Sequence, residues 1–268
     1  MSAAGRRMGR VAVTLAVIVW ALPTRAQTVP APADSTRGVE FLPRTLFHMT
    51  AERLSGDDPR LVWDAHLGGE LDLVEYGSGR FTFVGDYEAI LGEELRTFDP
   101  NQGSYILAAA ASARARGTEF AAVFHHQSRH LSDRAKDEPV DWNMLGGRVR
   151  RRFLVHEATL DARADLRGVV KKSFVDYSWE LDAAVRSDMM VGAHTSVLAS
   201  GGVRLLGVDG SRNRGTQIGY RVEGGVRFTG RAGAIELFVA AERRIDPVPL
   251  ESGTAHWASA GFRLLSRE

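Results

Sequence analysis

The sequence predicts an all-β fold, an antiparallel transmembrane barrel of about 12 strands, and three observations support this prediction. Segments of about ten residues alternate between apolar and polar side chains along nearly the whole chain. The connections between these segments alternate between short turns and long loops. After the N-terminal segment, the chain contains no run of about 18 apolar residues that could form a spanning helix. Together these features are typical of barrels of the bacterial outer membrane.

The N-terminal segment 1–26 predicts a signal peptide. Three arginines precede an apolar run at 11–22, which is too short for a stop-transfer helix, and small residues follow at 24 and 26. Residues 27–38 have the composition of a linker, and the barrel is expected over 39–268. The mature chain is therefore expected outside the cytoplasm, in the outer membrane.

The composition excludes several functional classes. The chain has no cysteine, which excludes disulfide scaffolds, thiolate metal sites and cysteine nucleophiles. The formal net charge is +1, but segment 1–26 carries four arginines and no acid, so the remainder is faintly acidic. Nucleic-acid binding needs an excess of basic charge, so we expect membrane lipids and no nucleic acid as partners.

The strands follow from the alternation, which is clearest at 62–73, 157–167, 175–186 and 217–228. Eleven strands are expected at 61–75, 79–91, 104–116, 119–130, 142–154, 157–167, 174–186, 189–205, 215–229, 233–245 and 255–265. The short turns are expected at 77–78, 117–118, 155–156, 187–188 and 230–232. The long loops are expected at 92–103, 131–141, 168–173, 206–214 and 246–254. Closure with both ends in the periplasm needs an even number, so we expect a twelfth strand within 41–50, starting after Pro43.

In this architecture the apolar face of each strand meets lipid and the charged face lines the interior. The lipid-facing set is expected to include Trp63, Tyr177, Trp179 and Phe228. The inward set is expected to include Asp161, Arg163 and Asp165, and the two aspartates are expected to pair with Arg148, Arg150 and Arg152.

One strand breaks this rule. The apolar face of strand 119–130 continues past Phe124 into His126, Ser128 and His130, and such a local contradiction often marks a functional site. Folding the following hairpin places Asn143 opposite or diagonal to Ser128. A hydroxyl, an imidazole and an amide are the groups of a serine nucleophile, its base and the residue that orients the base.

The same residues resemble a known family, the outer-membrane phospholipases A. The matching elements are His126-Gln-Ser128, then Ser132-Asp133, then Trp142-Asn143. Members of that family are twelve-stranded barrels with a lipid-exposed Ser-His-Asn triad and a catalytic calcium. The resemblance implies a lipid-degrading hydrolase with Ser128 as nucleophile, His126 as base and Asn143 as its orienter. It also implies a calcium ion near Ser132 and Asp133 that polarises the scissile carbonyl, and it allows a homodimer.

Other interpretations stay open. The family has Asn-Gly after the serine, where this chain has Arg129-His130, and the run 126–133 is equally similar to an uncharacterised family of predicted outer-membrane proteins. Lipid A deacylases are a third relative, for which Glu138 is the candidate acid. A non-catalytic barrel, either structural or a narrow pore, would use the histidines as an interfacial polar belt near Trp142. The sequence does not fix the lipid headgroup or the oligomeric state.

Overall fold

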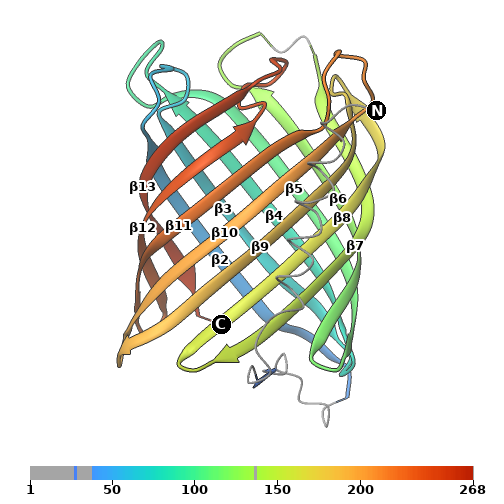
Figure 1. Ribbon diagram of the computed structural model, residues 1–268, viewed down its shortest axis with the longest axis vertical. Coiled ribbons are helices and arrows are strands. Elements are labelled where there is room, and N and C mark those ends of the chain that lie inside the picture. Colours follow the sequence, from blue (N-terminus) through green and yellow to red (C-terminus); the bar gives the residue numbers. More distant parts are fainter. Residues whose placement is uncertain (1–26, 29–37, 136–137, 268) are drawn as a thin grey trace, which may run out of the picture.

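The computed structural model describes residues 27–28, 38–135 and 138–267, and it shows a closed antiparallel β-barrel (Figure 1). The predicted signal peptide and most of the predicted linker lie outside the described residues. Each barrel strand pairs with its sequence neighbours, and the last strand, β13, pairs with the first barrel strand, β2, to close the ring. The barrel strands are β2 (Glu40–Leu54), β3 (Trp63–Glu75), β4 (Arg80–Gly92), β5 (Asp99–Ala115), β6 (Thr118–Leu131), β7 (Val140–Val155), β8 (Ala158–Ser173), β9 (Tyr177–Gly192), β10 (Thr195–Val208), β11 (Gln217–Thr229), β12 (Gly233–Ile245) and β13 (Thr254–Ser266).

These twelve strands confirm the predicted fold. A further two-residue strand, β1 (Gln27–Thr28), pairs with the end of β7. No helix among the described residues is long and apolar enough to cross a membrane.

The connections alternate in length as expected, with short turns at one end of the barrel and the longer loops at the other (Figure 1). Several boundaries differ from the prediction by three or more residues: β5 begins at Asp99 instead of 104, and β10 covers Thr195–Val208 instead of 189–205. Residues 168–173 continue β8 instead of forming a loop, because valines at 169 and 170 favour the extended backbone. The turn expected at 187–188 lies at 193–194, where the chain reverses after Gly192.

The expected twelfth strand is β2, but it begins at Glu40, before Pro43. The pairing with β3 shifts by one residue between Phe41 and Arg44, so the proline lies in a β-bulge and needs no ladder hydrogen bond there. Leu42 takes a positive φ of 52° in this bulge.

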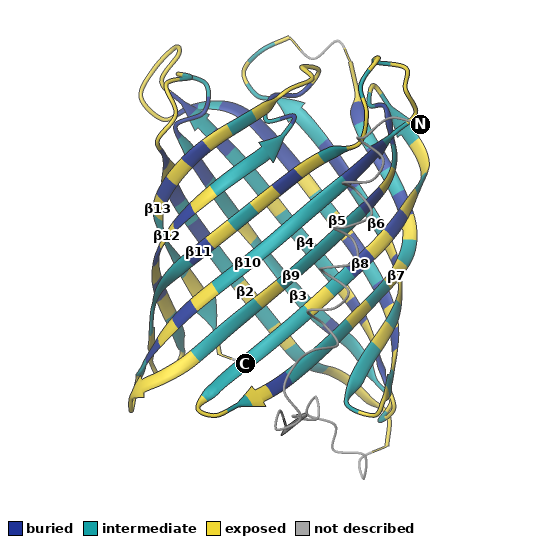
Figure 2. Cartoon of the chain, viewed as in Figure 1, coloured by how far each residue is buried: buried dark blue, intermediate teal, exposed yellow. Residues whose placement is uncertain are grey.

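The two faces of the wall have opposite chemistry, which appears as exposed and buried residues alternating along the strands (Figure 2). Trp179 and Phe228 are exposed on the outside as predicted. The prediction for Tyr177 is wrong. Its side chain does not face lipid but is buried inside the barrel, where it donates a hydrogen bond to Asp246 Oδ2 at 2.8 Å. Its register against β10 shifts at Gly207 and Val208, so Ser178 is an extra residue and reverses the side to which Tyr177 points.

Ion pairs fill the interior. Arg150 donates to Asp161 at 2.6 Å and Arg148 to Asp165 at 2.7 Å, which confirms the predicted pairing. Other pairs connect strands that are not neighbours: Arg221 with Glu52, Arg244 with Asp64, and Arg186 with Glu236. Buried carboxylates need such partners, since an unpaired charge is costly in a low-dielectric interior.

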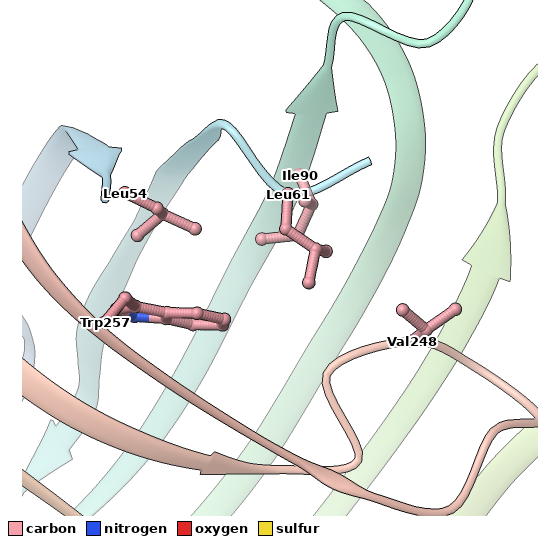
Figure 3. Close-up of a cluster of buried hydrophobic side chains, with 5 residues drawn as sticks. All are labelled: Leu54, Leu61, Ile90, Val248 and Trp257. Carbon is pink, nitrogen blue, oxygen red and sulfur yellow. The ribbon is translucent and has the colours of Figure 1, made fainter. Parts of the chain in front are cut away.

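Two apolar clusters lie inside the barrel at its long-loop end. The first joins Leu54, Leu61, Ile90, Val248 and Trp257 (Figure 3). The second joins Val140, Trp142, Met144, Tyr177 and Leu206. Loop 246–253 contributes Val248 to the first cluster, so this loop folds inward over the mouth of the barrel. Gln102 Nε2 and the Arg129 guanidinium each donate to the Pro247 carbonyl at 2.9 Å and hold the loop there.

Candidate active site on the lipid face

His126 of β6 and Asn143 of β7 are direct register partners, and their side chains are in contact. The distance from His126 Nδ1 to Asn143 Oδ1 is 2.9 Å. An amide oxygen can only accept, so the proton of the neutral ring lies on Nδ1 and the lone pair lies on Nε2. This is the tautomer that a general base needs.

Ser128 lies two residues further along β6 and therefore on the same face as His126. Its register partners are Tyr105 on β5 and Asp141 on β7, so Asn143 is diagonal to it, one of the two placements predicted. Ser128 is 8% exposed, and within the described part of the chain its hydroxyl has no hydrogen-bond partner.

The outward direction of this face is set by its apolar neighbours. Phe124 precedes His126 on the same face and is 41% exposed, and Leu145 follows Asn143 and is 53% exposed. The polar residues lie where β6 approaches the long-loop end of the barrel. Beside Asn143 the register with β8 shifts by one residue, which leaves Val170 as a β-bulge. Bulges are frequent next to sites where a side chain must be aimed.

The structure adds two neighbours that the sequence analysis did not single out, Asp141 and Tyr105. The Tyr105 ring lies edge-on to the His130 ring with centroids 5.9 Å apart, and it contacts the Tyr87 ring at 5.0 Å. These rings line one side of Ser128. Asp141 lies two residues before Asn143 on β7 and therefore on the same face. Extending the predicted hairpin pairing from Asn143 toward the loop would have identified it as a neighbour of Ser128.

The residues proposed to hold calcium have other partners. Asp133 Oδ2 accepts a hydrogen bond from Arg96 at 2.8 Å, and the Ser132 carbonyl accepts one from Arg134 at 3.0 Å. Hydrogen bonds to Glu94 and Asp99 raise the pKa of Arg134, so its positive charge is firmly held. Calcium needs six to eight oxygen ligands, and the two candidate oxygens here already accept hydrogen bonds from arginines. The surroundings of Ser132 and Asp133 therefore do not fit a calcium site.

Two further residues considered from the sequence lie away from this cluster. Glu138 is exposed in the loop between β6 and β7, and the partner of His126 Nδ1 is Asn143 instead. Arg129 points into the barrel and holds loop 246–253, so it cannot face an ester bound at Ser128.

Comparison with known proteins supports the fold. The outer membrane phospholipase of Salmonella typhi, a dimer with bound calcium, matches with a TM-score of 0.52 and 10% identity over 83% of this chain and 90% of that one. Outer membrane phospholipase A of Escherichia coli matches with a TM-score of 0.52 and 11% identity over 84% and 98% of the two chains. A KdgM porin in complex with oligogalacturonate matches at 0.48 and 7% identity over 83% and 99%. No protein-family model and no curated protein matches the sequence. The chain is thus a barrel of the outer-membrane type.

Proposed function

We propose that this protein is a serine esterase that hydrolyses acyl ester bonds of outer-leaflet phospholipids, in the manner of a phospholipase A. The observation that carries the proposal is the hydrogen bond between His126 and Asn143 on an otherwise apolar outer face, with Ser128 two residues away. A lipid ester reaches such a face directly from the membrane, at the boundary between hydrocarbon and headgroups.

In the proposed reaction Ser128 Oγ attacks the ester carbonyl carbon while His126 Nε2 takes the hydroxyl proton. The tetrahedral intermediate collapses, His126 returns the proton to the departing lysophospholipid oxygen, and an acyl-serine remains. Water activated by His126 then releases the fatty acid. Asn143 keeps the ring in the correct tautomer throughout, but as a neutral group it cannot offset the charge of the imidazolium.

The oxyanion needs donors fixed in advance. His130 lies on the same face as Ser128, two residues along β6, and is the side chain that we propose for this role. Calcium has no part in the proposed reaction, because arginines bind the oxygens of Ser132 and Asp133. We also propose that the protein forms a homodimer, because the similar Salmonella phospholipase is a dimer. Chemical crosslinking in detergent would detect such a dimer.

The three alternative functions are a narrow pore, a lipid A deacylase and a purely structural barrel. A narrow pore is disfavoured, because ion pairs cross the interior and loop 246–253 folds over the mouth. A lipid A deacylase would need Glu138 as the hydrogen-bond partner of His126, but that partner is Asn143. A purely structural barrel predicts no hydrolysis.

The test is fatty-acid release from phospholipid in mixed micelles by the refolded protein, compared with Ser128→Ala. Folding of both proteins is checked by the heat-modifiable gel shift of barrels. Release by the wild type that disappears in Ser128→Ala supports the proposal. Equal release by both proteins, or none by a folded wild type, refutes it.

A further inference from the structure

A second polar cluster lies inside the barrel, away from the lipid face, where β3 and β4 approach the long-loop end. Asp64 and His66 alternate on the inward face of β3, and Glu88 of β4 is the register partner of His66. One ligand atom from each of the three residues lies within 4.8 Å of the others.

We infer that Asp64, His66 and Glu88 form a binding site for a divalent transition-metal ion, with zinc as the best fit. His66 Nε2 lies 3.3 Å from Asp64 Oδ1 and 3.9 Å from Glu88 Oε1. A tetrahedral zinc site with bonds of about 2.0–2.1 Å has ligand atoms about 3.3 Å apart, so small side-chain movements bring all three into range. A lumen water supplies the fourth ligand.

Asp64 Oδ1 makes no hydrogen bond of good geometry with any of the described residues, although His66 Nε2 lies 3.3 Å away. Asp64 is completely buried, and Arg244 donates to its other oxygen, Oδ2, at 2.6 Å. An unpaired buried carboxylate oxygen is costly. This oxygen belongs to the proposed ligand set, and a cation there would satisfy it.

The other ring nitrogen of His66 is held by a carboxylate, as is usual for a histidine that binds a metal. His66 Nδ1 lies 2.8 Å from Asp86 Oδ2, which leaves Nε2 for the metal, as in carboxylate–histidine–zinc arrangements. Asp86 Oδ1 in turn contacts His48 Nε2 at 3.1 Å. Gly68 makes room for this carboxylate, since a Cβ there would lie 2.5 Å from Asp86 Oδ1.

The charges around the site leave room for a divalent ion. Asp64, Asp86 and Glu88 bring three carboxylates to the site. Arg244 donates to Asp64 Oδ2 at 2.6 Å and to Glu88 Oε1 at 3.1 Å and also pairs with Glu242, so a bound ion would use Asp64 Oδ1 and compete with Arg244 for Glu88. The Arg244 guanidinium lies 5.1 Å from the centroid of the Trp257 ring, which belongs to the apolar cluster at the long-loop end. The His66 side chain is 27% exposed, so the ion enters from the lumen.

The experiment uses refolded protein in detergent, dialysed against chelator and then against zinc chloride, with bound metal counted by mass spectrometry. We expect one zinc ion per chain in the wild type, and at least a tenfold loss of affinity in His66→Gln and Glu88→Gln. The matched control is His125→Gln, an interior histidine of β6 that contacts Arg167 and lies outside the proposed site, and it should keep the stoichiometry. Ser128→Ala also keeps it, so this inference and the proposed esterase fail separately.

A second readout does not depend on any variant. Cobalt(II) in place of zinc should give the intense visible absorption of a tetrahedral ion. A wild type that binds no zinc at micromolar concentrations, a cobalt complex without these bands, or a folded His66→Gln protein that binds like the wild type overturns the inference. In that case His66 serves only as a partner in ion pairs with Asp64 and Asp86.

Discussion

Replacing Asn143 by alanine is the most informative change at the candidate active site. It removes the side-chain hydrogen bond at His126 Nδ1, a contact of 2.9 Å, and leaves Ser128 and the apolar wall unchanged. The imidazole can then rotate, and its proton can move to the nitrogen that must act as base. Catalysis should fall without being lost.

The size of the effect follows from the type of contact. A neutral hydrogen bond contributes about 0.5–1.5 kcal/mol, which corresponds to a rate change of about 2- to 13-fold. Removing the base itself should cost about 100- to 10,000-fold, so His126→Ala should be far slower than Asn143→Ala. Ser128→Ala should retain only the background rate, because no nucleophile remains.

The assay is the initial rate of fatty-acid release from phospholipid micelles, with the gel shift as the control for folding. Glu138→Gln is the matched control, since it changes an exposed polar residue of the adjoining loop and should leave the rate unchanged. A rate that is insensitive to Asn143→Ala but falls in Glu138→Gln would refute the assignment and favour a deacylase-like site. An Asn143→Ala protein as inactive as Ser128→Ala would show that the amide does more than hold a tautomer.

Three further predictions concern the surroundings of the site. Activity should change less than twofold with chelator or in Asp133→Ala, because Arg96 holds that carboxylate; a chelator-sensitive rate that is lost in Asp133→Ala would restore the calcium hypothesis. Tyr105→Ala should lower KM for long-chain lipids by opening the face beside Ser128, whereas an unchanged KM would show that the ring does not limit access. Burial raises the pKa of the Asp246 carboxyl, but hydrogen bonds from Arg214, Gly253 and Tyr177 outweigh it and lower that pKa. The carboxylate therefore stabilises loop 246–253 above about pH 4, and this stability is lost as the pH falls through the lowered value. Hydrogen exchange of the loop should rise between pH 5 and 3 after correction for intrinsic rates, and Asp246→Asn should remove this dependence.

Much of the barrel could be predicted because its signal is repeated in every strand. Alternation fixes which residues share a face, and the ion pairs of Arg148 and Arg150 follow once neighbouring strands are aligned. The outward direction of His126 and Ser128 was predictable for the same reason, since Phe124 shares their face.

The remaining differences arise where two strands, and not one, decide the outcome. Tyr177 keeps perfect alternation with Trp179 in the sequence, yet Ser178 is a bulge only relative to β10, so no reading of one strand could place Tyr177 inside. The pairing of Asp133 with Arg96 is likewise a contact between two loops whose relative positions the sequence does not fix.

A catalytic site and an interfacial belt of polar residues place different requirements on His126 and its neighbours. A belt requires only that His126 and His130 lie near the headgroups, and it has no use for an acceptor that fixes the proton of one ring. A site built for chemistry places polar groups where apolar ones would be more stable, so removing them should cost activity and not stability. The variant Ser128→Ala should therefore lose hydrolysis while its resistance to heat and denaturant stays equal to or above that of the wild type. A belt predicts the opposite, a less stable barrel and no hydrolysis by either protein, because the polar side chains would then serve only to anchor the wall at the interface.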